Sequence, residues 1–84
     1  MPTLRATPDL AAQFLDHVAS QNSGTVPEEL ASALAAPLLS DSHTRREIIL
    51  VAWPQVSDEL ADAMRRHGYE NWRQEQIDAE EHAE

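Results

Sequence analysis

The tetrapeptide Ser40-Asp41-Ser42-His43 contains a nucleophile, an acid and a base, the three residue types of a serine-hydrolase triad. Residues adjacent in a chain rarely turn their side chains toward one another, and no strand–turn–helix pattern surrounds either serine. A helix cap explains both serines better, because Ser side chains accept hydrogen bonds from the first N–H groups of a helix. We therefore predict no catalytic residue and a protein that is not an enzyme.

The four histidines are the remaining candidates for metal chemistry. None lies four residues from another, and His82, four residues after Asp78, supplies only one imidazole and one exposed carboxylate. The chain has no cysteine, which excludes thiolate metal sites and disulfides. It has only two glycines, too few for a glycine-rich phosphate loop. The sequence predicts no metal and no cofactor.

Charge is the most informative chemical feature of this sequence. Fifteen Asp and Glu oppose six Arg and no Lys, and the formal net charge is −9. Residues 69–84 hold one arginine against six acids, which is more than half of the imbalance. Such a surface repels phosphate backbones and anionic membranes and attracts basic surfaces. A GC-rich genome or adaptation to salt would produce the same composition without a basic partner, so both explanations stay open.

The length of 84 residues suits one domain with a compact core. The longest apolar run, Ile48 to Trp53, is far too short to span a bilayer, and the first residues lack the apolar stretch of a signal peptide. We expect a soluble, cytoplasmic protein.

Capping signals and periodicity predict an all-α fold, a small bundle of four to five short helices. Thr7 caps a helix that runs from Pro8 to about Ser20. Thr25 and Glu28 fit a capping box for a second helix, which Pro37 should bend or end. The predicted apolar stripes of these two helices are Leu10, Phe14, Leu15 and Val18, and Leu30, Leu34 and Leu38.

The segment Ile48 to Trp53 suits either a buried strand or a central helix. We favour a helix from His43 to Trp53, because the chain offers no second strand to pair with it. Pro54 is expected to end this helix, and Ser57 to cap the next one. That next helix should close at Gly68 in a left-handed conformation, with Tyr69 packing back on Met64.

Residues 1–68 are predicted to form a helical core and residues 69–84 an acidic C-terminal tail, helical or fraying, that Trp72 anchors. The charge favours a protein-binding module whose partner has a basic, nucleic-acid-binding surface, as an inhibitor or antitoxin-like protein of a phage or bacterium would have. Its acids would then mimic nucleic-acid phosphates or dock on a basic toxin or enzyme. The predicted partner-binding residues are Trp72, Glu70, Glu75, Asp78, Glu80 and Glu81.

Arg45 and Arg46 lie near the start of a helix, where the helix dipole disfavours cations. Ion pairs with acids of the same or another helix would compensate them. An acidic patch on a second copy would do the same, and a homodimer would then form through Arg45, Arg46, Ile48 and Ile49.

A helix-turn-helix DNA-binding regulator is the alternative function. The two helices joined by residues 53–57 would form the motif, with residues 58–67 as recognition helix. That helix would direct Asp58, Glu59 and Asp62 at the phosphates. We therefore place protein binding first and expect no direct contact with nucleic acid or membrane.

Overall fold

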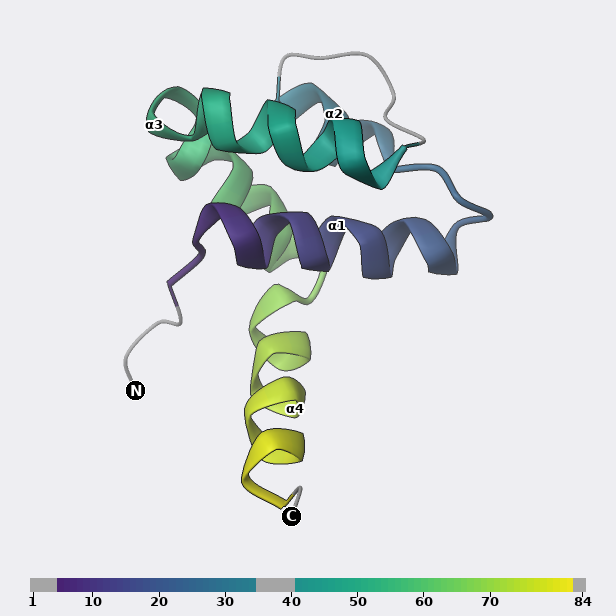
Figure 1. Cartoon of the computed structure of the whole chain (residues 1–84), viewed down its shortest axis with the longest axis vertical. Coiled ribbons are helices and arrows are strands. Elements are labelled where there is room, and N and C mark those ends of the chain that lie inside the picture. The colour runs from purple at the N-terminus through teal and green to yellow at the C-terminus, as the bar shows by residue number, and fades with distance from the viewer. Residues whose placement is uncertain (1–4, 35–40, 83–84) are drawn as a thin grey trace.

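The computed structural model describes residues 5–34 and 41–82, and these residues form four α-helices without a strand. The helices are α1 (Pro8–Gln21), α2 (Glu28–Ala33), α3 (Ser42–Arg66) and α4 (Tyr69–His82). α1 packs chiefly against α3, α2 lies against α3 as well, and α4 leaves the other three helices at the end of α3 (Figure 1). The predicted all-α class is confirmed.

The start and end of α1 follow local sequence chemistry. Thr7 Oγ1 accepts a hydrogen bond of 3.2 Å from the Leu10 N–H, and Pro8 occupies the first turn. At the other end Ser23 and Gly24 have φ values of 58° and 89°, and the Gly24 N–H donates to the Ala19 carbonyl at 2.7 Å. This left-handed closure satisfies one of the free carbonyls at the helix end. The predicted helix is confirmed.

The predicted capping box of α2 is wrong. The Thr25 hydroxyl donates 2.9 Å back to the Asn22 carbonyl, so it closes the preceding turn and does not cap the helix. The residue before α2 is Pro27, and no side chain caps the first N–H groups. Leu30 and Leu34 are buried as predicted. The predictions for Pro37 and Leu38 lie outside the described residues.

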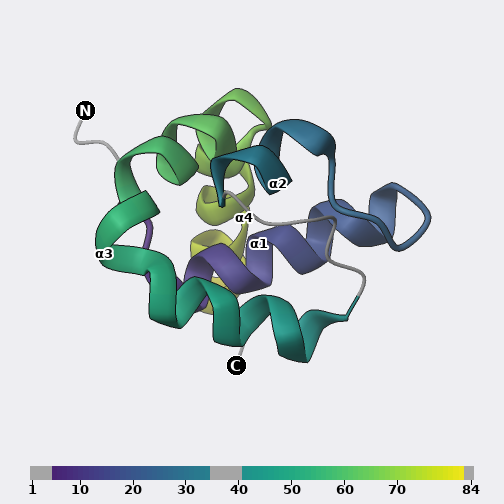
Figure 2. The same cartoon turned by 90° about the horizontal axis from the view of Figure 1, so that it is seen from above.

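α3 corrects two further predictions, because it continues through Pro54 and contains Ser57 within the helix. Proline lacks an N–H and crowds the preceding turn, which bends a helix when packing holds both halves. Figure 2 shows α3 curving around α1 in this way. Ile49 before the proline and Leu60 after it are both fully buried, so the core fixes the two halves. The segment Ile48 to Trp53 is helical, as favoured.

At its start α3 is capped by Asp41 and not by Ser42, which lies within the helix, whereas its end at Gly68 is as predicted. The Asp41 carboxylate accepts hydrogen bonds from the Thr44 N–H at 3.3 Å and from the Thr44 hydroxyl at 2.6 Å. The hydroxyl contact, together with the N–H, holds the pKa of Asp41 below its usual value. Gly68 has a φ of 90°, and its N–H donates to the Arg65 carbonyl at 3.1 Å. Only glycine reaches this conformation without strain.

An aromatic cluster joins the first turn of α4 to the body. The ring of Phe14 meets Tyr69 and Trp72 edge-on, each with centroids 5.4 Å apart. The Tyr69 hydroxyl donates to the Arg5 carbonyl at 3.1 Å, which ties the N-terminal segment to α4. Tyr69 and Trp72 thus belong to the core cluster. The buried apolar residues are Ala11, Ala12, Phe14, Leu15, Ala19, Val26, Leu30, Ala31, Leu34, Ile49, Leu60, Ala63, Met64, Tyr69 and Trp72.

Candidate functional site

The candidate site is the part of α4 that follows Trp72. It extends away from the other helices (Figure 1), and Arg73 and Ile77 are its only half-buried residues within the described range. Four acids lie along it, and none of them forms an ion pair within the described part of the chain. They are Glu75, Asp78, Glu80 and Glu81.

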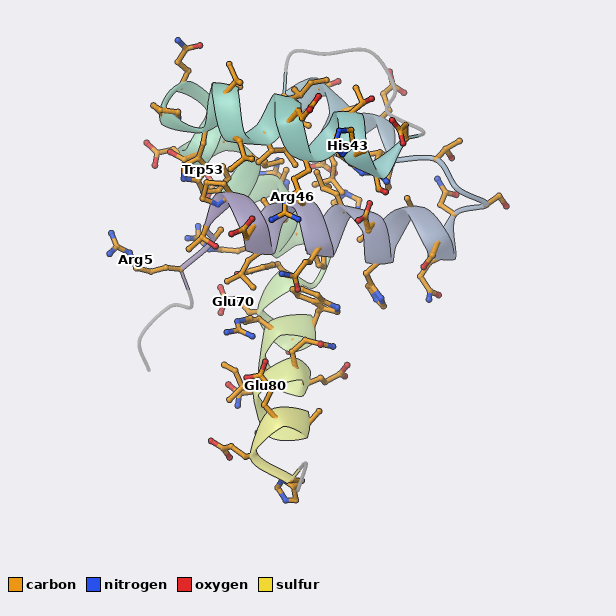
Figure 3. The ribbon with its side chains drawn as sticks, viewed as in Figure 1. Arg5, His43, Arg46, Trp53, Glu70 and Glu80 are labelled. Atoms are coloured by element: carbon orange, nitrogen blue, oxygen red, sulfur yellow. The ribbon has the colours of Figure 1, made fainter. Side chains whose placement is uncertain are left out.

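The helical repeat places the acids of α4 around the helix axis relative to its two buried rings. At 3.6 residues per turn, Glu70, Asp78 and Glu81 fall on the side of α4 opposite Tyr69 and Trp72. Figure 3 shows Glu70 near the body and Glu80 further along the same helix. Glu70 also lies 3.5 Å from Arg65, so its charge is partly compensated, whereas the four later acids present theirs to solvent.

Trp72 lies on the other side of α4. It is 9% exposed and packs against Phe14 and against His17, whose ring centroid is 6.1 Å away. A partner that meets Asp78 and Glu81 would therefore not meet the indole ring. The Tyr69-x-x-Trp72 spacing, one helical turn, is the sequence signal that both rings share the core side.

Acids of α1 compensate the charges of the two arginines at the start of α3. Ion pairs with another helix were one of the two predicted ways to compensate them. Arg45 is 3% exposed, and its guanidinium donates to Asp16 Oδ1 from Nε at 3.1 Å and from a terminal nitrogen at 2.5 Å. Arg46 is exposed and lies 2.9 Å from Asp9. Nothing in the sequence distinguishes these two neighbours, because burial depends on which side of α3 faces α1.

The other residues predicted for a homodimer face the protein interior. Ile49 is fully buried and Ile48 is half-buried against the core. The large apolar side chains that α3 does expose are Leu50 and Val51, at 49% and 82%. A second copy placed on α3 would thus meet Leu50 and Val51 instead of Ile48 and Ile49.

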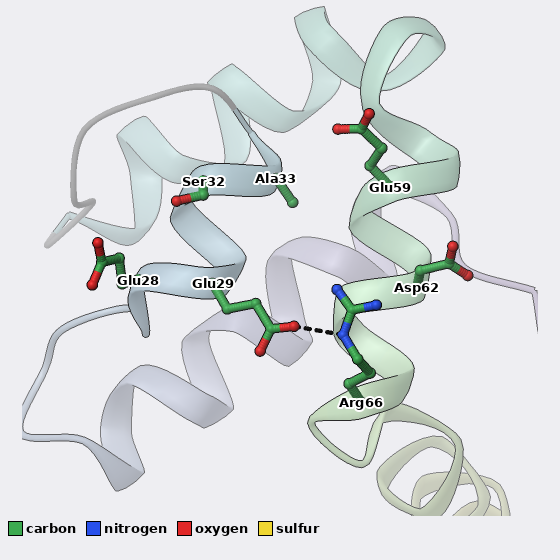
Figure 4. Close-up of a pocket in the computed structure, with 7 residues that line it drawn as sticks. All are labelled: Glu28, Glu29, Ser32, Ala33, Glu59, Asp62 and Arg66. Atoms are coloured by element: carbon green, nitrogen blue, oxygen red, sulfur yellow. Dashed lines mark hydrogen bonds and ion pairs between the residues drawn. The ribbon is translucent and has the colours of Figure 1, made fainter.

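An acidic groove between α2 and the second half of α3 was missed by sequence reasoning (Figure 4). Its volume is about 680 Å³, and Glu29 crosses it to Arg66 at 2.5 Å and to His67 Nε2 at 2.9 Å. The hydrogen bonds from Arg66 and then from His67 lower the pKa of Glu29. The only indication of this groove in the sequence was the two adjacent acids at the start of each of two predicted helices. The groove is lined by Glu28, Glu29, Ser32, Ala33, Glu59, Asp62 and Arg66.

The residues first considered for catalysis have structural partners. Asp41 caps α3, and His43 Nε2 lies 3.2 Å from Glu47 one turn later. Ser40 lies outside the described residues. Across residues 5–34 and 41–82, no group of three or more His, Asp or Glu side chains could hold a metal ion. No helix in these two ranges has the length and apolar content needed to cross a membrane.

The fold and its surface define a small acidic helical protein with one projecting helix. In comparisons with known proteins, no family model, no curated protein and no solved structure matches the chain. Function is therefore inferred from the side chains of this chain alone.

Proposed function

We propose that the protein is a non-enzymatic binding module that engages the basic surface of a nucleic-acid-binding protein through α4, as an inhibitor or antitoxin-like protein would. The observation that carries the proposal is the charge of α4 after Trp72. There, four acids with no ion-pair partner among the described residues accompany a single arginine on a projecting helix. A basic surface is electrostatically complementary to these negative charges.

Four of the five arginines of the body do not offset this charge. Arg45, Arg46, Arg65 and Arg66 each lie within 4 Å of a carboxylate of α1, α2, α3 or α4. Their charges are thus neutralised inside the molecule, and the exposed acids of α4 determine the local potential. The part of α4 after Trp72 is mostly polar, and such a helix is only marginally stable in water, so a partner that covers it would stabilise it.

The charge density of α4 supports phosphate mimicry. Glu75 and Glu81 are six residues apart, or about 9 Å along a helix, and four carboxylates lie in that span. This is about one charge per 2–3 Å, comparable to the one charge per ~1.7 Å of duplex DNA. A protein groove built for a nucleic-acid backbone would therefore find a similar linear density on α4.

The test compares two variants with the same change in net charge. In the first, the α4 acids become Glu75→Gln, Asp78→Asn, Glu80→Gln and Glu81→Gln. In the control, four exposed acids outside α4 become Asp9→Asn, Glu28→Gln, Glu59→Gln and Asp62→Asn. Tagged full-length proteins are used to capture partners from nuclease-treated host extract, and captured proteins are identified by mass spectrometry.

We expect basic nucleic-acid-binding proteins to be captured by the wild type and the control, and lost with the α4 variant. The melting temperature of the α4 variant should stay close to that of wild type, because the α4 acids make no ion pair within the described chain. Equal capture by all three proteins would mean that the acids serve only solubility. Salt-sensitive, sequence-preferring binding of duplex DNA by the protein itself would contradict the proposal and restore the DNA-binding alternative. That alternative needs a turn at residues 53–57, where α3 is continuous.

A further inference from the structure

The outer side of the α3 bend carries a continuous exposed stripe. Residues one helical turn apart lie next to each other on a helix, so Glu47, Leu50, Val51, Pro54 and Asp58 form one row. All of them are exposed, whereas Ile49 on the other side is fully buried. We call this row the α3 stripe. Figure 3 shows Trp53 on the inner side, between α3 and the start of α1.

The centre of the α3 stripe is apolar and its two ends are acidic. Val51 is 82% exposed and Leu50 is 49% exposed, and they are the large apolar side chains that the described residues expose most. Pro54 adds a third apolar surface one turn later. It also has no N–H to donate to the Leu50 carbonyl, so that acceptor has lost its helical partner. Glu47 and Asp58 flank this centre about 16 Å apart along the helix.

A second copy of the chain is a poor occupant for the α3 stripe. If two stripes cross antiparallel, Val51 of one copy faces Pro54 of the other, and Glu47 then faces Asp58. If they run parallel, each acid faces the same acid of the other copy. Both arrangements oppose like charges, which is destabilising, and the net charge of −9 adds to the repulsion.

We infer that the α3 stripe docks an amphipathic helix of a partner protein, with an apolar row flanked at each end by Lys or Arg about three turns apart. The apolar row covers Leu50, Val51 and Pro54, and the cations meet Glu47 and Asp58. This mode of recognition uses apolar anchors at helical spacing, with charges that fix register. The inference rests on the proposed function for the basic character of the partner. It adds a surface at the opposite end of the molecule from the tip of α4 (Figure 1).

The test uses a synthetic probe on the full chain. The probe is a helical peptide of about 18 residues, roughly five turns, with a leucine row and a lysine pair at each end of the row. Two control peptides have Glu in place of Lys, or the lysines moved to the middle of the row. The four α4 acids are replaced by amides in the protein, so that nonspecific attraction of the peptide to α4 is removed. Binding is measured by calorimetry and mapped by backbone NMR shifts.

We expect the end-lysine peptide to bind and to shift the resonances of residues 47–58. Leu50→Ser with Val51→Ser should weaken binding about tenfold or more, since two apolar side chains lose their burial. Glu47→Gln with Asp58→Asn should weaken it about threefold to tenfold. The matched pair Glu28→Gln with Glu59→Gln, outside the stripe, should change it less than about twofold. Circular dichroism checks that each variant keeps its helices.

The inference is overturned if the three peptides bind equally, if the shifts map elsewhere, or if nothing binds. It is also overturned if sedimentation shows a dimer that Val51→Ser dissociates, since the occupant is then a second copy. The peptide experiment lacks the α4 acids and the capture experiment depends on them. Failure of the inference and failure of the proposed function are therefore distinguishable.

Discussion

Removing the carboxylate of Asp16 should destabilise the protein more than removing the cation it binds. The Arg45 side chain is only 4% exposed, whereas Asp16 is 45% exposed. Asp16→Ala therefore leaves a guanidinium in the interior without this carboxylate, while Arg45→Met leaves a carboxylate that water still reaches. Breaking a buried pair costs about 3–5 kcal/mol, and replacing it with apolar atoms of similar volume is often nearly neutral.

The expected magnitude follows from the exposure of Asp16. Water already screens half of this carboxylate, and alanine is the better helix former by about 0.5 kcal/mol. We expect Asp16→Ala to cost about 2 kcal/mol, a fall in melting temperature of about 8–16 °C for a domain of this size. Arg45→Met should cost less than about 1 kcal/mol. Asp62→Ala, which removes the exposed partner of Arg65 at 2.8 Å, should cost about 0–1 kcal/mol.

Thermal and urea unfolding followed by circular dichroism measure these differences. Equal destabilisation by Asp16→Ala and Asp62→Ala would show that burial of the guanidinium does not matter. A larger cost for Arg45→Met than for Asp16→Ala would refute the reasoning directly, because the desolvated cation would then be a net source of stability.

Three further predictions concern pH and the aromatic cluster. Glu29 has a lowered pKa in the folded protein, so its stabilisation is present above its usual pKa of 4.5 and is lost as pH falls through the lowered value. The melting temperature of wild type should therefore exceed that of Glu29→Gln at neutral pH and converge with it in acid. Burial raises the pKa of Tyr69 above 10.0, so its stabilisation is present below pH 10.0 and is lost as pH rises through the raised value. Tyr69→Phe should lose about 1 kcal/mol at neutral pH, with the hydrogen bond to the Arg5 carbonyl, and should show less alkaline destabilisation in a pH series of urea titrations. Trp72→Ala should cost about 3–5 kcal/mol and abolish the near-ultraviolet circular dichroism of the cluster, and an unchanged spectrum would contradict the packing against Phe14.

The parts of the fold that sequence predicted are those that neighbouring residues determine. Thr7 and Pro8 start α1, and Gly68 takes the left-handed position after α3, because each depends on a few adjacent backbone groups. The error at Pro54 has the opposite origin. Its local effect is to break a helix, but Ile49 and Leu60 are both fully buried, and their packing keeps α3 continuous through the bend.

The candidate site was predicted in part for the same reason. The acids of α4 lie close together in the sequence, so they can be recognised there as one charged segment. The groove of Glu29 and Arg66 joins residues 37 positions apart, and the burial of Arg45 depends on its facing Asp16 on another helix. Neither arrangement has a local signature, so both required the packing of α2 and α1 on α3.

The internal ion pairs explain why a chain with six arginines remains strongly acidic at one end. Arg45, Arg46 and Arg66 pair with acids of α1 and α2, and these pairs link the helices of the body. Opposite charges held a few ångströms apart cancel beyond a Debye length of about 8 Å at physiological salt. The acids after Trp72 lack such partners within the described chain, so their field extends from α4 into solvent. The same pairs that link the helices of the body therefore make the charge of the molecule directional, and the basic partner that we propose would be drawn to α4 before it reached the less charged α3 stripe.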